Sequence, residues 1–381
     1  MKFMHLADLH LGKRVNEFSM LEDQKYVLEQ VLKLLDEERA DALLIAGDIY
    51  DRQIPPIEAV RLFDFFLTRV AERHIQVYLI SGNHDSIERV SFGARLMESS
   101  GIHMATEYDG TVDFVTVEDE YGVIDIYLLP FLKPAQVRAV WGEEAEQIRT
   151  YQEALAFVMS KLTRNMEHRS ILLAHQFVAG AAVCDSEEHA VGGLDQVEVS
   201  CFDGFDYVAL GHLHGAQCAG RDVVRYAGTL LKYSFSEVSH KKSVTMVELK
   251  EKGNVEIYSR PITPLHEMRD IRGSYEQVTK RSNYENTDTR DYVRITLTDE
   301  EDIFDAVGKL RVIYPNLMRL EYDNMRTRQH QSVKVPEQEE EKTPFTLLEE
   351  LFVLQNNKPM SKEQGAYMQE MIRRVWEDET I

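Results

Sequence analysis

Five short polar motifs contain the side chains whose types and spacing could carry chemistry. Each follows a run of apolar residues: Asp8-Leu9-His10, Gly47-Asp48-Ile49-Tyr50-Asp51, Gly82-Asn83-His84-Asp85, Ala174-His175 and Gly211-His212-Leu213-His214. Their functional groups are carboxylates, imidazoles and one amide, without a thiolate, and hard or borderline divalent cations prefer such ligands. The sequence therefore predicts a metal centre built from oxygen and nitrogen ligands.

Asp48 lies between the other candidate ligands in the sequence, so its carboxylate could bridge two cations. In two-metal sites such cations are about 3.5–4 Å apart. The spacings D-x-H and H-x-H suit this arrangement, because residues i and i+2 of a segment leaving a strand can point to the same side. We expect one cation to be bound by Asp8, His10, Asp48 and His214, and the other by Asp48, Asn83, His175 and His212.

The segments between the motifs must position these side chains, and their hydrophobic pattern predicts an α/β layered fold. Apolar runs predict strands at 3–6, 42–46, 77–80, 123–129, 171–174, 207–210 and 244–249, and helical spacing predicts helices at 21–35 and 60–70. The five motifs then lie on loops at one edge of the sheets, where a rigid scaffold can hold polar side chains in place.

The chain after residue 265 is organised differently. Residues 1–265 form the expected catalytic domain, and 266–328 indicate a small α+β unit with strands at 292–297 and 317–322 and a helix at 303–313. Residues 329–344 are rich in glutamate and poor in apolar residues, which predicts an acidic, solvated linker. Residues 345–381 regain helical periodicity and predict a helical hairpin. Its apolar stripes are Phe345, Leu348 and Phe352, followed by Met368, Met371, Ile372 and Val375.

Composition limits the classes of function. The 381 residues carry a formal net charge of −22, which argues against a protein that coats DNA through a broad basic surface. A nuclease is not excluded, because bound cations reverse the local field of a carboxylate site. Three widely spaced cysteines, Cys184, Cys201 and Cys218, predict reduced thiols. No targeting segment or membrane span is apparent, so we expect a cytoplasmic, nucleoid-associated protein.

The order of the five motifs resembles that of the calcineurin-like metallophosphoesterases over roughly the first 265 residues. Each motif alone is a weak signal, but five in this order, each after a strand, are highly specific. The resemblance implies a four-layer α-β-β-α core. Two bound cations would then activate a water and stabilise charge on the phosphoryl oxygens.

A narrower resemblance is to the SbcD family, the nuclease subunits of bacterial double-strand-break processing complexes. It rests on the first, second and last motifs with Gln217, on the segments 226–229 and 233–237, and on the domain order. It implies manganese as the metal, 3′→5′ exonuclease action on double-stranded DNA, and endonuclease action on single strands or hairpins. The unit 266–328 would cap DNA, and 345–381 would bind an SbcC-type coiled-coil ATPase in DNA repair, recombination and replication. Archaeal and eukaryotic relatives usually carry a histidine where this chain has Asp51, which therefore receives only a supporting role.

Several further residues are assigned by their position beside the motifs. His84 is expected to protonate the leaving oxygen, and Asp85 to hold the His84 ring in one tautomer. DNA contacts are expected from basic residues that follow the first three motifs, namely Lys13, Arg14, Arg52 and Arg89. A homodimer is expected through helices near 57–70 and 88–98, mainly from the resemblance.

Two other functions compete with the nuclease. One is a generic phosphodiesterase or phosphatase of the same superfamily acting on a small substrate. The phosphatases typically extend the second motif to G-D-x-x-D-R-G and end the third with Glu, whereas here Gln53 follows Arg52 and the third motif ends in Asp85. The other is an inactive scaffold, which predicts missing ligands, whereas every inferred ligand is present.

Overall fold

The computed structural model describes residues 1–187, 195–325, 327–328, 343–356 and 359–378. The chain divides into two compact units, Met1–His266 and Glu267–Ile381, which are described separately. None of the helices in these described segments is both long and apolar enough to cross a bilayer.

One sheet of the first unit is built around parallel strands from the N-terminal part of the chain. Its order is β16 (Val255–Pro261), β15 (Ser243–Leu249), β1 (Lys2–Leu6), β4 (Ala42–Ala46), β5 (Gln76–Ile80) and β6 (Ile102–Ala105). The strands β1, β4, β5 and β6 run parallel, while β15 is antiparallel to both of its neighbours. The carboxyl ends of β1, β4 and β5 therefore lie at one edge.

The second sheet repeats this plan with later strands. Its order is β13 (Gln217–Ala219), β14 (Arg221–Tyr226), β12 (Tyr207–Gly211), β9 (Arg169–His175), β8 (Gly122–Leu129) and β7 (Asp113–Asp119). The four strands β14, β12, β9 and β8 are parallel, with antiparallel partners at both edges. The carboxyl ends of β9 and β12 again share an edge.

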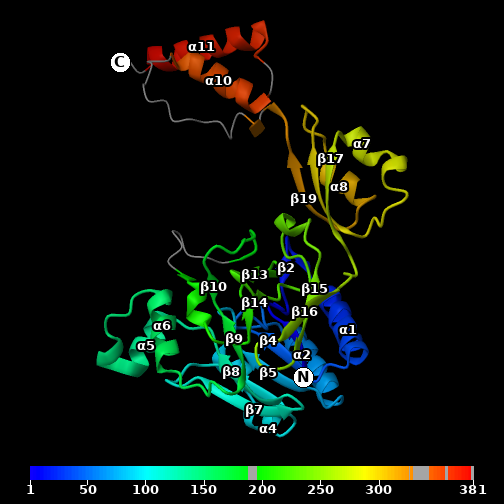
Figure 1. The fold of residues 1–381 in the computed structure, drawn as a ribbon. Coiled ribbons are helices and arrows are strands. Elements are labelled where there is room, and N and C mark those ends of the chain that lie inside the picture. The colour runs from blue at the N-terminus through cyan, green and yellow to red at the C-terminus, as the bar shows by residue number, and fades with distance from the viewer. Residues whose placement is uncertain (188–194, 326, 329–342, 357–358, 379–381) are drawn as a thin grey trace. The chain divides into compact units, whose positions relative to one another are not determined.

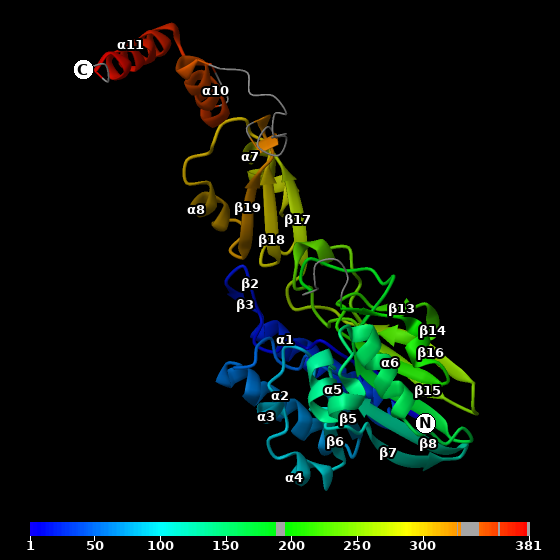
Figure 2. The ribbon, with the colours of Figure 1, turned by 90° about the vertical axis from the view of Figure 1, so that its left-hand side faces the viewer.

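The two sheets pack face to face and helices cover their outer faces (Figures 1 and 2). Phe3, Leu44 and Tyr78 of the first sheet share one buried cluster with Ile171 and Ala209 of the second. The helices α1 (Leu21–Glu38) and α2 (Ile57–Ala71) lie beside the first sheet, and α5 (Pro134–Trp141) and α6 (Tyr151–Lys161) beside the second. The predicted four-layer α-β-β-α core is thereby confirmed.

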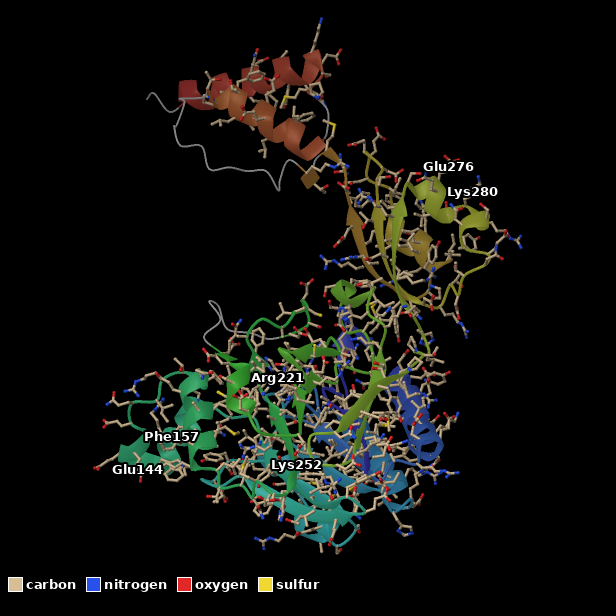
Figure 3. The ribbon with its side chains drawn as sticks, in the orientation of Figure 1. Glu144, Phe157, Arg221, Lys252, Glu276 and Lys280 are labelled. Atoms are coloured by element: carbon tan, nitrogen blue, oxygen red, sulfur yellow. The ribbon has the colours of Figure 1, made fainter. Side chains whose placement is uncertain are left out.

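The outer layer on the second sheet is fastened by both apolar and charged contacts. Phe157 of α6 packs against the core and lies edge-on to Trp141. Lys161 at the end of α6 binds Glu144 of η1 (Gly142–Ala145) at 2.8 Å, and Figure 3 shows Glu144 and Phe157 on this layer. The layer therefore depends on the apolar face of α6 more than on its exposed ion pair.

The segment 88–98, expected to be one helix, forms two short helices. They are α3 (Ile87–Val90) and α4 (Ala94–Glu98), separated at Gly93, whose φ of 79° interrupts the helical path. The strands and helices expected elsewhere in the first unit coincide with observed elements, apart from shifts of up to one helical turn at their ends. Small additional elements are β2 (Arg14–Val15), β3 (Phe18–Ser19), β10 (Phe177–Val178), β11 (Gln196–Val197), η2 (Val199–Phe202) and η3 (Phe235–Glu237).

The second unit begins with a three-stranded parallel sheet in the order β17 (Met268–Gly273), β18 (Tyr292–Leu297) and β19 (Leu317–Tyr322). Its apolar core includes Val293, Ile295 and Leu310. The connections carry α7 (Tyr275–Thr279), η4 (Arg281–Asn283) and α8 (Ala306–Arg311). The helix expected at 303–313 is shorter: it begins after Asp305, whose φ of 49° is left-handed, and it ends at Arg311.

The chain ends in two helices, α10 (Pro344–Asn356) and α11 (Lys362–Asp378). Most of the expected linker, residues 329–342, lies outside the described residues, as do 357–358 and 379–381. Leu347 and Leu351 on α10, and Tyr367 and Met371 on α11, expose large apolar side chains.

Candidate metal centre

The five motifs meet where the carboxyl ends of the central strands converge. The first two motifs continue the pairing of β1 with β4 beyond the sheet, since the amides of Asp8 and His10 donate to the carbonyls of Gly47 and Asp48, both at 3.0 Å. The fourth and fifth motifs follow β9 and β12 of the second sheet. Strand topology alone therefore places every predicted ligand on one side of the domain.

Close approach between the loops requires glycine at two points. A Cβ on Gly211 would lie 1.8 Å from the carbonyl oxygen of Ala46, and one on Gly82 would lie 2.1 Å from the Asp48 carboxylate. Gly211 thus brings the second sheet against β4, and Gly82 brings the third motif against the second. Any larger residue would push the ligand loops apart.

Four predicted ligands have strained backbones. The φ angles are positive at Asp8 (53°), His10 (44°), Asp48 (51°) and His212 (108°). Such conformations cost about 1–3 kcal/mol each in a non-glycine residue and cluster at functional sites. The surrounding sheets hold these turns, and the turns aim the side chains toward a common point.

Asp48 is shared by two groups of potential ligands. One group is His10, Asp48 and His84, and the other is Asp8, Asp48 and His175, each with ligand atoms within 4.8 Å of one another. Oδ2 of Asp48 is 3.3 Å from Nε2 of His175 and 3.8 Å from Nε2 of His10. The carboxylate is placed to contact two ions.

The remaining ligands complete these groups. Oδ1 of Asn83 lies 3.1 Å from both Nε2 of His175 and Nδ1 of His212. Nε2 of His214 is 3.1 Å from Nε2 of His10. The structure therefore brings all seven predicted ligands together, and we propose that they bind the metals as two sets sharing Asp48.

The hydrogen-bond partners and the pKa of His175 are compatible with a metal ion bound at its Nε2. Its Nδ1 lies 2.8 Å from the carbonyl of Ala46, which can only accept, so Nδ1 carries the hydrogen and Nε2 faces the oxygens of Asp48 and Asn83. Burial lowers the pKa of His175, but the Asp48 carboxylate outweighs it and raises that pKa to about 9. A proton on Nε2 thus stands where a metal would bind.

Other groups in the site also fit a cation. Nδ1 of His10 and Nε2 of His212 are buried and have no hydrogen-bond partner among the described residues. Burial lowers the pKa of His212 to about 3, so this ring is neutral and can donate a lone pair. Burial also raises the pKa of Asp8 well above its usual range, and the nearby Asp48 charge adds to this effect. Two buried carboxyl groups beside imidazole nitrogens that lack a partner are the environment that a divalent cation stabilises.

His84 is placed differently from the buried ligands. Its Nδ1 lies 3.1 Å from the carbonyl of Asp51, which fixes the hydrogen on Nδ1, and its side chain is 18% exposed. Its Nε2 is 3.9 Å from Oδ2 of Asp48. The ring therefore directs Nε2 toward the candidate metal ligands, while part of its side chain stays exposed.

The role expected for Asp85 is wrong. The carboxylate does not hold the His84 ring; it accepts hydrogen bonds from the backbone amides of Ile49 (3.1 Å), Tyr50 (2.9 Å) and Gly82 (2.9 Å). Asp85 is buried, and burial followed by the charge of Asp48 raises its pKa to about 6. It fastens the second motif to the third, so the His84 ring is held by the main chain and not by Asp85.

Replacing Asp85 by asparagine should therefore destabilise the fold. In either orientation the amide nitrogen faces at least one backbone N–H that has lost its acceptor, which costs about 1–3 kcal/mol. Urea unfolding of the metal-free protein measures this. Asp109→Asn is the matched control, because Asp109 also accepts from a backbone amide, that of Thr111, but is exposed. Equal effects of the two substitutions would contradict the role given to Asp85.

The predicted DNA-contact residues separate into two kinds. Lys13 binds the Asp51 carboxylate at 2.7 Å and lies over the Tyr233 ring, so it supports the site from within. Arg14 donates to the carbonyl of Glu17 at the surface. Arg52, with a side chain 67% exposed, and Arg89, which is exposed, remain accessible beside the second and third motifs.

Sequence reasoning missed a group of buried polar residues behind the first motif. The Gln24 amide donates to the carbonyl of His10 (2.8 Å) and to the hydroxyl of Tyr233 (2.9 Å), and its oxygen accepts from the amide of Gly12 (3.0 Å). The Tyr233 hydroxyl donates to the carbonyl of Leu9 at 2.7 Å. Gln24 lies three and four residues before Val27 and Leu28, on the same apolar face of the predicted helix. A polar residue on that face was the sequence feature that could have indicated these buried hydrogen bonds.

Comparison with known proteins agrees with this geometry. A family model described as calcineurin-like phosphoesterase matches residues 1–216. A second model, described as Type 5 capsule protein repressor C-terminal domain, matches residues 264–356. The D subunit of nuclease SbcCD from Staphylococcus epidermidis (strain ATCC 12228 / FDA PCI 1200) is 32% identical over 342 residues, which cover 88% of this chain and 89% of that protein.

Two solved structures are more distant in sequence. A dimetal phosphatase from Danio rerio is 13% identical with a TM-score of 0.41, covering 70% of this chain and 98% of that one. A Thermus thermophilus protein is 15% identical with a TM-score of 0.39, covering 68% and 98%. The matches in sequence and the metal-ligand geometry lead to one assignment. The chain belongs to the calcineurin-like phosphoesterases and, among them, to the SbcD family of nuclease subunits.

Proposed function

We propose that this protein is a two-metal DNA nuclease that acts as a 3′→5′ exonuclease on double strands and as an endonuclease on single strands and hairpins. The observation that carries the proposal is the convergence of the seven candidate ligands on Asp48. The relative from Staphylococcus epidermidis is named as a nuclease subunit, which favours DNA over a small phosphoester as the substrate.

The metals would be held in two sets that share Asp48. As expected from the sequence, Asp8, His10 and His214 would complete one set, and Asn83, His175 and His212 the other. The Asp8 carboxylate also lies within 4.8 Å of a ring nitrogen of His175, so it stands close to both sets. When bound, two cations supply an activated water and stabilise negative charge on the phosphoryl oxygens. We propose Mn(II) for both sites, as the resemblance to the SbcD family implies. The oxygen and imidazole donors are compatible with Mn(II), and also with iron or zinc.

His84 would protonate the leaving oxygen. Because Nδ1 donates to the carbonyl of Asp51, a transferable proton resides on Nε2 only when the ring is positively charged. Oδ2 of the Asp48 carboxylate lies 3.9 Å from that nitrogen. The backbone amide of His84 donates to Oδ1 of Asp48 at 2.9 Å, which fixes the distance between the acid and the metal ligand.

The substrate class can be tested with three phosphodiesters. The purified chain is incubated in Mn(II) with a linear duplex, a hairpin oligonucleotide and bis(p-nitrophenyl) phosphate. The proposal expects shortening of the duplex from 3′ ends and opening of the hairpin. If the chain cleaves the small ester but leaves both DNAs intact, even with an SbcC-type ATPase present, the nuclease proposal is contradicted. The generic phosphodiesterase would then be the better assignment.

We propose that the C-terminal helices, within 345–381, bind an SbcC-type ATPase, while 266–328 cap the DNA and 329–344 act as a linker. The support is an exposed apolar surface: Leu347 is 52% exposed and Leu351, one turn later on α10, is 47% exposed. Tyr367 on α11 is 64% exposed. Apolar faces of this kind are typical of helix-in-groove recognition.

A double substitution on α10 tests this partner surface. Leu347→Asp with Leu351→Asp should weaken binding of an SbcC-type ATPase by at least about 30-fold, because the loss of even one central apolar contact of about 2 kcal/mol has that effect. Cleavage of bis(p-nitrophenyl) phosphate should be unchanged. Glu349→Gln, on the same helix, is the control. Undiminished binding, measured by titration calorimetry, would move the interface elsewhere.

We also propose a homodimer formed through the region of α2, α3 and α4. Phe92 is 83% exposed, Leu96 79% and Ile57 61%. Phe63, Phe66 and Leu67 of α2 are buried in the domain, so they are not available to a partner. Contiguous exposed apolar patches mark interaction sites, and these three side chains lie in the region where the homodimer is proposed. Sedimentation equilibrium of the full chain tests the proposal, and a monomer at every accessible concentration would contradict it.

A further inference from the structure

The metal ligand His214 is held at three points by segments distant in sequence. Nδ1 of its ring lies 2.7 Å from the hydroxyl of Ser186. Its backbone amide donates to the carboxylate of Glu187. Its carbonyl accepts from Nζ of Lys242 at 3.0 Å and from the amide of Thr229 at 3.1 Å. Residues that are not ligands themselves therefore fix both the backbone and the ring of His214.

The hydroxyl of Ser186 determines which nitrogen of His214 carries the hydrogen. This hydroxyl donates its single proton to Oε1 of Glu237 at 2.6 Å. Its oxygen must therefore accept from His214, which places a hydrogen on Nδ1. In the neutral ring Nε2 then keeps its lone pair, and this atom lies toward His10 within the metal centre.

Glu237 is able to accept because it is held ionised by a buried cation. It is fully buried, and Nζ of Lys242 lies 2.5 Å from its Oε2. Lys242 uses its other N–H groups on the Thr229 hydroxyl (2.7 Å) and the His214 carbonyl. The buried ion pair is fully hydrogen-bonded, so its geometry is fixed.

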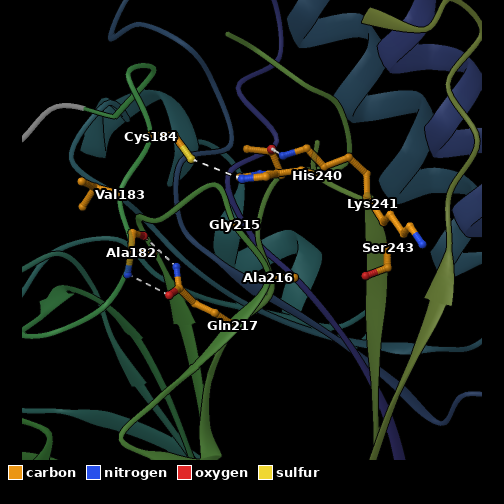
Figure 4. Close-up of a pocket in the computed structure, with 11 residues that line it drawn as sticks. Ala182, Val183, Cys184, Gly215, Ala216, Gln217, His240, Lys241 and Ser243 are labelled. Carbon is orange, nitrogen blue, oxygen red and sulfur yellow. Dashed lines mark hydrogen bonds between the residues drawn. The ribbon is translucent and has the colours of Figure 1, made fainter. Parts of the chain in front are cut away.

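Ser186 is itself positioned by its own segment, residues 181–187. The side-chain amide of Gln217 exchanges two hydrogen bonds with the backbone of Ala182, at 2.9 and 2.8 Å. The amide of Asp185 donates to the hydroxyl of Ser236 at 3.1 Å. Figure 4 shows the Gln217–Ala182 pair beside a cavity of about 280 Å³, with Cys184 near His240 on its other side. The segment is therefore fastened at two points that precede Ser186.

The two metal sets differ in how their histidines are oriented. In His175 the hydrogen on Nδ1 is fixed by a main-chain carbonyl of β4, that of Ala46. In His214 the same task falls to side chains. We propose that Ser186 and Glu237 are positioning residues that hold His214 in the Nδ1–H tautomer and thereby set the metal affinity of its set alone. The inference rests on the two-metal function proposed above.

Binding measurements on the full chain test the effect on affinity. Titration of Mn(II), followed by the electron paramagnetic resonance of free Mn(II), should show two sites in the wild type. Ser186→Ala should weaken one site by about 10- to 100-fold, as loss of a hydrogen-bond partner behind a histidine ligand typically does, and leave the other unchanged. Ser186→Thr, which keeps the hydroxyl, should restore the affinity. Ser236→Ala is the control, since it loosens the same segment without touching His214.

A second variant reverses the direction of the hydrogen bonds. In Glu237→Gln the amide oxygen should face Lys242, so the amide nitrogen donates to Ser186. The hydroxyl must then donate to Nδ1 of His214, which favours the Nε2–H tautomer and removes the lone pair from the metal centre. We expect weaker Mn(II) binding at the affected site than in Ser186→Ala. Thermal unfolding of the variant confirms that the chain is folded.

The tautomer can be observed directly in the metal-free protein. Long-range ¹H–¹⁵N correlation spectra distinguish Nδ1–H from Nε2–H imidazoles, and the His214 signals are assigned by their loss in His214→Gln. We expect Nδ1–H in the wild type and a shift toward Nε2–H in both variants. An Nε2–H ring in the wild type, or equal Mn(II) affinities in wild type and Ser186→Ala, would overturn the inference. A wild type that binds fewer than two ions would instead count against the proposed function, while the spectra would still decide the role of Ser186.

Discussion

His84→Gln should nearly abolish DNA cleavage while leaving both Mn(II) sites intact. The His84 ring is partly exposed, and its Nε2 is the nitrogen that does not bond the Asp51 carbonyl. Glutamine can keep a hydrogen bond to that carbonyl but cannot transfer a proton. Loss of a general acid typically lowers the rate by about 10²- to 10⁴-fold. Cleavage of a linear duplex and Mn(II) titration, done on the same preparation, measure the two effects.

The outcome separates two roles for His84. The ring also lies close to His10 and Asp48, within a group that could hold an ion. If His84 were a ligand, the variant would lose Mn(II) affinity together with activity, and the acid role would be contradicted. His103→Gln is the control, because His103 stacks on Tyr78 in the same domain and belongs to none of the five motifs.

Asp48→Asn should remove both metal sites at once. The Asp48 carboxylate belongs to both ligand groups. Burial raises its pKa, but the nearby rings of His175, His10 and His84 outweigh burial and hold that pKa well below its usual range. The amide has the same shape without the charge, so each ion loses a bridging ligand. We expect Mn(II) affinity to fall by at least about 100-fold at both sites, more than the about 10- to 100-fold typical for a residue behind the ligands.

The substitution is informative because the fold should tolerate it. Asp48 has a φ of 51°, and asparagine adopts this left-handed region readily. The metal-free variant does lose the buried ion pair with His175, so we expect it to unfold cooperatively but at a lower temperature than the wild type. Retention of one tight Mn(II) site in Asp48→Asn would contradict the bridging role. His175→Gln provides the comparison, since it should weaken only one of the two sites.

The sequence allowed the catalytic domain's layers to be predicted because its signals are local. Strands such as β4 and β12 are short apolar runs, and each is followed at once by its polar motif. Parallel strands bring such motifs to one edge whatever the loops contain. The positions of Asp8, Asp48 and His175 in the centre therefore followed from patterns only a few residues long.

The parts that could not be predicted depend on contacts between distant segments. Asp85 binds amides of the second motif, more than thirty residues away, and no local pattern distinguishes this from a bond to its neighbour His84. Ser186 lies in a segment without helix or strand periodicity, and its partner Glu237 is far along the chain. Lys13 follows the first motif as a DNA contact would, yet the fold pairs it with Asp51.

Anomalous X-ray diffraction from crystals grown with Mn(II) tests the two-metal site most directly. The account predicts two peaks per chain, on either side of the Asp48 carboxylate and about 3.5–4 Å apart. One peak should have Asp8, His10 and His214 as its other ligands, and the second Asn83, His175 and His212. A single peak, or two peaks that do not share Asp48, would contradict it.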